Sequence, residues 1–147
     1  MANEAIVKLG TPKTLEASGA SNANNTMVAA DDATYSVSAD GSNYPDADFV
    51  LAVAFGTAPT VNTTIDLYAQ ELDIDGTNDA IAPTTTYKRR YIGSFVVAAQ
   101  TAMQYLKVRG YDVPLVASYY LHNNATGQTM SAGWTLKVTP RTIGPAA

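Results

Sequence analysis

Short runs of apolar or alternating residues, each ended by a turn signal, repeat along the chain from Asp48 to Arg141. The strongest run covers residues 49–55, where Phe49, Leu51 and Val53 share one face at the two-residue period of a β-strand. The side chains on its other face are apolar but small, which is typical of a strand in the middle of a sheet. Short strands that recur about every 8–12 residues are typical of a sandwich or barrel. The sequence therefore predicts an all-β fold, an antiparallel β-sandwich.

Further strands are predicted at residues 4–9, 35–38, 65–70, 87–97, 103–109, 115–121 and 134–139. Gly93 indicates a bulge in its run, and Pro140 is expected to end the last strand. Residues 96–106 also fit helical spacing, but Tyr105 and Val108 favour a turn followed by a strand. With roughly eight strands and little helix, we expect a jelly-roll-like sandwich built from two Greek keys.

The segment of residues 11–33 is small and polar, so it offers little apolar surface to bury. We expect residues 1–33 to form an extended N-terminal arm and residues 34–147 to form the β-sandwich domain. Two interpretations of the arm stay open. It crosses a neighbouring subunit, or it is a plain flexible surface loop.

Composition excludes several classes of protein. The 147 residues are one domain by length, and the chain has no cysteine and a single histidine, His122. A net charge of -4 and a pI of about 4.7 do not fit a nucleic-acid-binding protein. Charged residues make up only 15% of the chain, and such a weakly repulsive surface suits lateral packing against other subunits. No run is long and apolar enough for a signal peptide or a membrane span.

Few residues have the chemistry of catalysis. His122 would serve as a general base only beside an activated nucleophile, and no Gly-x-Ser-x-Gly motif occurs. Asp66, Glu71 and Asp73 are close in sequence, but Asp66 and Glu71 have opposite strand parity and so should project from different faces of the sheet. A glycosidase needs both carboxylates in one cleft. We expect no enzyme and no cofactor.

One loop is a candidate metal site. Asp73, Asp75 and Asp79 surround Gly76, and calcium takes several oxygen ligands from short flexible loops. The spacing differs from that of an EF-hand loop. If such a loop began at Asp73, its twelfth residue would be a glutamate, but residue 84 is Thr84. A tight turn at Asp75-Gly76 is the interpretation that we favour over calcium.

Basic and aromatic residues leave two further alternatives. Residues 88–90 are the only basic run, and they are expected to alternate within a strand. They would form an ion pair at the rim with an acidic neighbouring subunit, or they would be a solvated strand start. Tyr119 and Tyr120 should point to opposite faces of the sheet. An exposed row of tyrosines would stack on sugar rings or fill a protein interface.

Several sequence blocks carry a family resemblance. They are DFVL at 48–51, FGTAP at 55–59, IDLY at 65–68, DIDGTND at 73–79, IGSF at 92–95, QYLKVRG at 104–110 with Pro114, YLHNN at 120–124 and SAGWTL at 131–136. In their order they resemble tailed-bacteriophage virion proteins, in particular head decoration (cement) proteins with a jelly-roll β-sandwich. The first 47 residues lie outside this resemblance.

The resemblance implies a structural protein of the virion. It would be made in the cytoplasm of the bacterial host and lie on the capsid surface. Its partners would be the major capsid protein lattice and other copies of itself, as a homotrimer, with no nucleic acid and no membrane. The alternative is a carbohydrate- or receptor-binding module of a tail fibre or baseplate, which exposed tyrosines and Trp134 near residues 73–79 would support. The sequence does not locate the interface.

Overall fold

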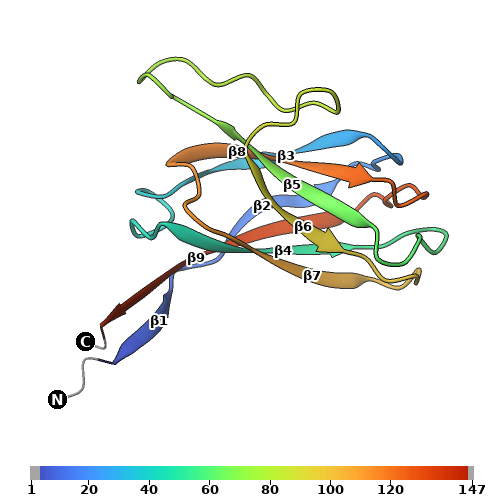
Figure 1. Ribbon diagram of the computed structural model, residues 1–147, viewed down its shortest axis with the longest axis horizontal. Coiled ribbons are helices and arrows are strands. Elements are labelled where there is room, and N and C mark those ends of the chain that lie inside the picture. The colour runs from blue at the N-terminus through green and yellow to red at the C-terminus, as the bar shows by residue number, and fades with distance from the viewer. Residues whose placement is uncertain (1–3, 146–147) are drawn as a thin grey trace.

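The computed structural model describes residues 4–145, which form two antiparallel β-sheets packed face to face (Figure 1). The described part of the chain has no helix, so the predicted all-β sandwich is confirmed. The nine strands are β1 (Ala5–Leu9), β2 (Lys13–Gly19), β3 (Met27–Ser36), β4 (Asp46–Val53), β5 (Thr64–Glu71), β6 (Tyr91–Val96), β7 (Gln104–Gly110), β8 (Val116–Asn124) and β9 (Trp134–Pro145).

The strand pairs are nested. The first sheet has the order β1-β9-β4-β7, with β2 also paired to β9, and the second sheet has the order β3-β8-β5-β6. Thus β5 pairs with β6, β4 with β7, β3 with β8 and β2 with β9. From β2 onward, every connection except the one between β5 and β6 passes from one sheet to the other. The chain is therefore wound as one long antiparallel hairpin folded over on itself.

The core lies between the two sheets and follows the predicted alternation. Phe49, Leu51 and Val53 of β4 are fully buried, and the ring of Phe49 lies 4.9 Å from that of Tyr119 in the opposite sheet. Tyr119 is buried and Tyr120 is half-buried on the other face, as their parity predicts. β4 lies between β9 and β7, so it is a central strand of its sheet, as its sequence predicts.

The predicted domain boundary between residues 33 and 34 is wrong. β3 runs through this boundary and pairs with β8, while β2 pairs with β9. Leu15 and Ala30 are buried in the core. Residues 13–36 are therefore part of the sandwich and are held mainly by main-chain hydrogen bonds to β8 and β9. Because main-chain pairing does not require large apolar side chains, the small and polar composition of this segment did not indicate it.

The segment that projects from the sandwich is shorter than predicted and comes from both ends of the chain. β1 pairs only with the last residues of β9, from Leu9 opposite Arg141 to Ala5 opposite Pro145. Figure 1 shows this two-stranded ribbon extending away from the body. Pro140 does not end β9, because it lies where the partner of β9 changes from β2 to β1. A missing N–H is tolerated at such a break in the pairing.

Two predictions about the β6–β7 region are confirmed and one is wrong. The register shifts between Leu67 and Tyr68 where β5 passes Gly93, which is the predicted bulge. Residues 104–110 form a strand and not part of a helix. Residues 88–90, however, precede β6 and belong to the long connection of residues 72–90, where Arg90 takes a left-handed φ of 56° that is uncommon for a residue other than glycine.

Candidate functional site: the outer face of the first sheet

Basic and aromatic side chains gather on the solvent side of the first sheet. On β7, Leu106 and Val108 pack against the core, so Tyr105, Lys107 and Arg109 point outward. Pairing with β4 places Tyr105 beside Ala52, Lys107 beside Val50 and Arg109 beside Asp48. We refer to the outward residues Asp48, Val50, Ala52, Tyr105, Lys107, Arg109, Lys137 and Arg141 as the outer face.

Asp48 is the centre of this face. Its side chain is only 5% exposed and lies within 3.0 Å of Lys107 Nζ and Arg109 Nε and 3.5 Å of Arg141 Nη1. Burial by itself would raise the pKa of the Asp48 carboxyl group, but the hydrogen bonds from Lys107 and Arg109 outweigh burial and lower it. Asp48 is therefore an anion at neutral pH, and it holds three basic side chains from β7 and β9 in fixed positions.

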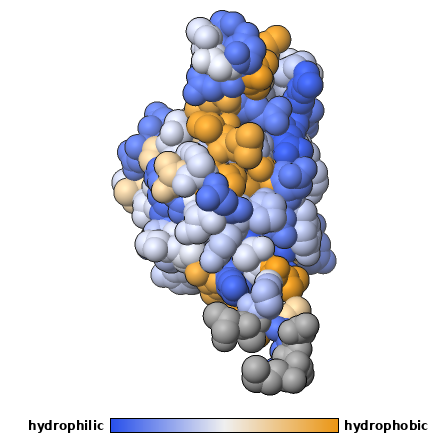
Figure 2. Space-filling view, turned by 90° about the vertical axis from the view of Figure 1, so that its left-hand side faces the viewer, coloured by the Kyte–Doolittle hydropathy of each residue, from blue (hydrophilic) through white to orange (hydrophobic). Residues whose placement is uncertain are grey.

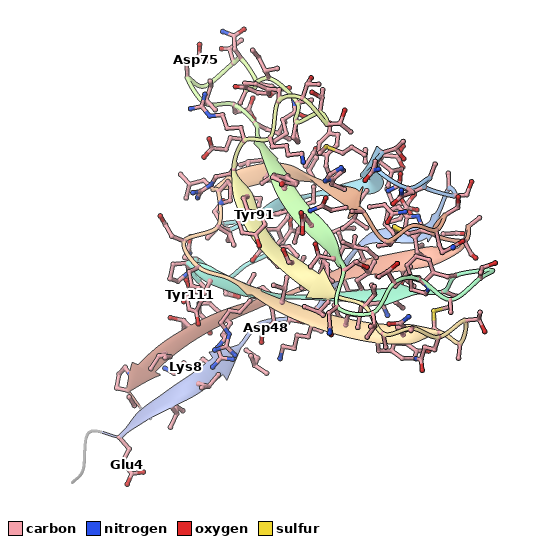
Figure 3. The ribbon with its side chains drawn as sticks, turned by 45° about the vertical axis from the view of Figure 1, so that its right-hand side comes forward. Glu4, Lys8, Asp48, Asp75, Tyr91 and Tyr111 are labelled. Carbon is pink, nitrogen blue, oxygen red and sulfur yellow. The ribbon has the colours of Figure 1, made fainter. Side chains whose placement is uncertain are left out.

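The rim of the face is open to solvent. Tyr105 is 77% exposed and Tyr111, just beyond β7, is 69% exposed. Figure 3 places Asp48 and Tyr111 toward the end of the sandwich from which the ribbon extends. On β4, the apolar residues Val50 and Ala52 follow Asp48 on the same face, with Val50 between Lys107 and Lys137. Tyr and Arg on a flat sheet are the residue types that dominate protein–protein interfaces.

The sequence-based analysis missed this face. Lys107 and Arg109 are separated by 27 or more residues from Lys137 and Arg141, so no basic run marks them. Only the pairing of β4 with both β7 and β9 brings them together around Asp48. The sequence does contain one signal for this face. Tyr105, Lys107 and Arg109 alternate with apolar residues, which predicts that they share one side of a strand.

The second sheet carries a polar network around Asp66. Ser94 Oγ donates to Asp66 Oδ1 at 2.6 Å, and Asn124 Nδ2 donates to Asp66 Oδ2 at 2.8 Å. His122 lies opposite Asp66 on the neighbouring strand and is 3% exposed. Burial lowers the pKa of His122, and its Nδ1 atom has no hydrogen-bond partner. The one histidine is therefore a neutral, buried side chain.

The candidate calcium loop of residues 73–79 forms the hydrogen-bonded tight turn that the sequence analysis favoured. Asp75 accepts hydrogen bonds from the Thr77 and Asn78 amides and from the Asn78 side chain, and Asp79 accepts one from the Asp73 amide. Gly76 has a φ of 88°, as expected for the left-handed position of a tight turn. These bonds lower the pKa of Asp75, with the Asn78 side chain as the largest cause. The Asp75 carboxylate thus already binds the loop itself.

A second group of acidic side chains comes together from β2 and β3. The carboxylates of Glu16, Asp31 and Asp32 lie within 4.8 Å of one another. Glu16 is buried and accepts hydrogen bonds from the Ser18 and Asp31 amides, and Asp32 accepts one from the Ala17 amide. No sequence motif predicts this cluster, because Glu16 and Asp31 come from strands of different sheets.

The remaining predicted residues are distributed over the loops and the core. Arg90 donates to the carbonyl oxygen of Asp112 and lies 3.7 Å from Glu71, so it ties the base of the 72–90 connection to the body. Trp134 is 1% exposed, and its indole donates to the Ala20 carbonyl at 2.7 Å. It is therefore a core residue and not part of a sugar-binding surface near residues 73–79.

Comparisons with known proteins do not add to this description. No protein-family model, no curated protein and no solved structure matches the chain. Within residues 4–145, no helix is present that would be long and apolar enough to cross a membrane.

Proposed function

We propose that this chain is a non-enzymatic structural protein of a bacteriophage virion. It would be made in the cytoplasm of the bacterial host and act as a decoration or cement protein on the capsid surface. In this proposal the outer face of the first sheet binds the lattice of the major capsid protein and stiffens the head. The observation that carries it is the ordered set of basic side chains around Asp48, flanked by exposed Tyr105 and Tyr111.

The architecture supports an attachment role. The nested strand pairs are those expected of a jelly roll, the fold that the sequence resemblance implies. Lys107, Arg109 and Arg141 are already held by Asp48, so less side-chain freedom is lost on binding than with free basic side chains. A rigid and wide surface of this kind suits repeated attachment to a regular lattice.

Binding of glycans on a tail fibre or baseplate has less support. It was expected to use Trp134 near residues 73–79, and that side chain is in the core. The exposed Tyr91 on the second sheet hydrogen-bonds Ser94 at 2.7 Å, and this hydroxyl pair is one group that a sugar would contact. We therefore retain attachment to the head as the proposed function.

Electron microscopy of purified particles of the phage that encodes the chain tests this proposal. We expect density for the protein on the head lattice, with the β7 side toward the capsid. In particles stripped of the protein and reconstituted, Tyr105→Ala should weaken binding about tenfold, as for an exposed aromatic anchor. Tyr91→Ala, on the other sheet, is the matched control and should bind as wild type. Density on the tail alone would reject the proposal.

A further inference from the structure

One histidine and one aspartate of the second sheet are buried although neither faces the core. On β5 and β8 the core residues alternate with Asp66 and His122, so both side chains point to the outer side of the sheet. They are nonetheless only 6% and 3% exposed. Figure 1 shows the 72–90 connection on this outer side, away from the first sheet.

The middle of this connection, residues 81–89, lies over His122, and we refer to it as the strap. Residues 83–85 of the strap line a cleft of about 370 Å³ together with Met27 and Tyr120. Met27 lies opposite His122 in the pairing of β3 with β8, and Tyr120 precedes His122 on the same face of β8. The strap is therefore part of what buries the histidine.

The strap is fixed at its two ends and lightly held between them. Before it, the Ala80 amide donates to the Glu71 carbonyl oxygen at 2.8 Å, and after it the Arg90 carbonyl oxygen accepts from the Ala69 amide at 3.0 Å. Among residues 4–145, no hydrogen bond joins the strap itself to a strand. Figure 2 shows the far end of the connection rising above the body as a narrow lobe. Such a segment can open without unpairing a strand.

His122 is the group beneath the strap whose charge changes near neutral pH. Its Nδ1 atom is buried and has no hydrogen-bond partner. A neutral imidazole can leave this nitrogen as an unused acceptor, whereas an imidazolium carries a proton on both ring nitrogens. Protonation under the closed strap would therefore bury a charge and an unsatisfied donor, which is costly.

The charged groups around His122 act in opposite directions. Burial is the largest cause that lowers the pKa of His122, and the positive charge of Lys88 on the strap lowers it further. Asp66 on β5 raises this pKa without reversing the shift, and its two carboxylate oxygens already accept hydrogen bonds from Ser94 and Asn124. The closed strap thus holds one positive charge near the place where a second would form.

The other neighbours of His122 are uncharged. Met27 lies opposite it on β3, and a main-chain hydrogen bond with Asn25 is the smallest of the causes that act on its pKa. Tyr68 and Tyr120 lie on the same outer side, and burial raises the pKa of each phenol, so both stay neutral in mild acid. His122 is therefore the side chain here whose ordinary pKa falls between pH 5 and pH 8.

We propose that His122 makes the strap sensitive to pH. At neutral pH the strap closes over the uncharged imidazole, and protonation of the imidazole in mild acid opens the strap and uncovers the outer side of the second sheet. The sign follows from linkage, because the pKa of His122 under the closed strap lies below the value of about 6.5 for an exposed histidine. Closure is therefore favoured above about pH 6.5, and the ratio of open to closed strap should rise by up to about thirtyfold between pH 7.5 and pH 5. This device does not depend on the capsid as partner.

The absence of native cysteine allows two spin labels to be placed for a direct test. Thr86→Cys puts one label on the exposed strap, and Val96→Cys puts the other at a 53% exposed position of β6. Double electron–electron resonance at pH 7.5 and pH 5 should show a population with longer distances between the labels that grows at pH 5. The control pair, Lys137→Cys with Val96→Cys, omits the strap and should give the same distances at both pH values. A distance from the strap that does not change with pH would overturn the proposal.

The single histidine provides an independent readout by NMR, because its Cε1 proton signal belongs to one residue. In wild type, the titration of His122 and the change in label distance should have the same midpoint. His122→Asn cannot be protonated at this position and should keep the strap closed at pH 5. Different midpoints, or an acid response that persists in His122→Asn, would reject the proposal.

A matched pair of charge changes tests the role of the strap lysine. Lys88→Gln removes the charge that opposes protonation of the closed form, so it should reduce the open population at pH 5. Arg89→Gln removes the same charge from the next residue, whose side chain donates to the Tyr87 hydroxyl, and should respond to acid as wild type does. Equal effects of the two changes would contradict a direct action of Lys88 on His122.

Discussion

At the level of single residues, Asp48 links stability to the proposed binding surface. Because its carboxylate holds Lys107 and Arg109 at 3.0 Å, it orders two side chains of the outer face as well as joining β4 to β7. A buried anion of this kind is stabilising only while its cationic partners are present. Its removal should therefore change both the free energy of unfolding and the order of the face.

We predict that Asp48→Asn lowers the free energy of unfolding by about 1.5–3 kcal/mol at pH 7, the range for hydrogen bonds to charged groups. The folded pKa of Asp48 lies below its unfolded value of about 3.9, so its stabilisation is present above that pH and is lost as pH falls through the folded pKa. Urea titrations from pH 7 to pH 3 should show the difference between the two proteins shrinking below pH 4.

Asp112→Asn is the control for this series, because Asp112 lies on the exposed bend after β7. A constant difference between wild type and Asp48→Asn over the whole pH range would show that Asp48 does not act through its charge.

Gly19 is a second residue with a specific physical requirement. A Cβ atom at this position would overlap the indole ring of Trp134, which is fully buried. Gly19→Ala should therefore displace the ring and lower the free energy of unfolding by about 1–3 kcal/mol, the usual cost of overpacking a core. Thermal unfolding followed by tryptophan fluorescence measures both effects, since the chain has one tryptophan. Gly56→Ala is the control, because nothing lies within 4 Å of a Cβ there.

At the level of elements, alternation of large apolar residues predicted the strands that carry most of the core. β4, β5, β7 and β8 lie close to their predicted ranges because each has a face that must be buried. β2 and all but the end of β3 escaped prediction because they contribute small residues such as Ala30 and are held by pairing partners 80 or more residues away. Such pairing depends on the winding of the whole chain, which no local pattern encodes.

The candidate site was less predictable than the fold for the same reason. The sequence marks Asp73, Asp75 and Asp79 because they are neighbours in the chain, but their oxygens form a turn. The outer face and the cluster of Glu16 with Asp31 consist of residues from different strands. Their proximity follows from strand order, which the sequence alone left open.

Two truncations of the predicted arm, one long and one short, should have different effects on folding. Removing residues 1–33 deletes β2 and most of β3, including buried Leu15 and Ala30, so we expect the remaining chain not to fold. Removing residues 1–9 deletes only β1, which lies outside the core, and should leave a cooperative thermal transition near that of wild type. Circular dichroism of both truncations measures this. A folded protein without residues 1–33 would contradict the observed role of β2 and β3.

At the level of the whole molecule, charge is distributed unevenly. The chain has a net charge of -4, yet four of its nine basic residues, Lys107, Arg109, Lys137 and Arg141, project from the outer face of the first sheet. Asp48 and Asp46 are the acidic residues of β4 on that side. The molecule therefore has an electric dipole: basic residues gather on one side, although the net charge of the whole chain is negative. Such an asymmetry orients a protein toward an acidic partner surface during encounter.

This distribution predicts how attachment to particles should depend on salt. If the outer face binds an acidic lattice, raising the NaCl concentration should reduce attachment progressively, since exposed charges are screened over about 8 Å at physiological ionic strength. Lys137→Glu, at an exposed position of β9, should reduce attachment at low salt and flatten the salt dependence. Lys88→Glu makes the same charge change on the exposed 72–90 connection and should leave attachment close to that of wild type. Co-sedimentation of each protein with stripped particles measures binding across the salt series. Equal loss in the two variants would mean that overall charge, and not the outer face, governs attachment.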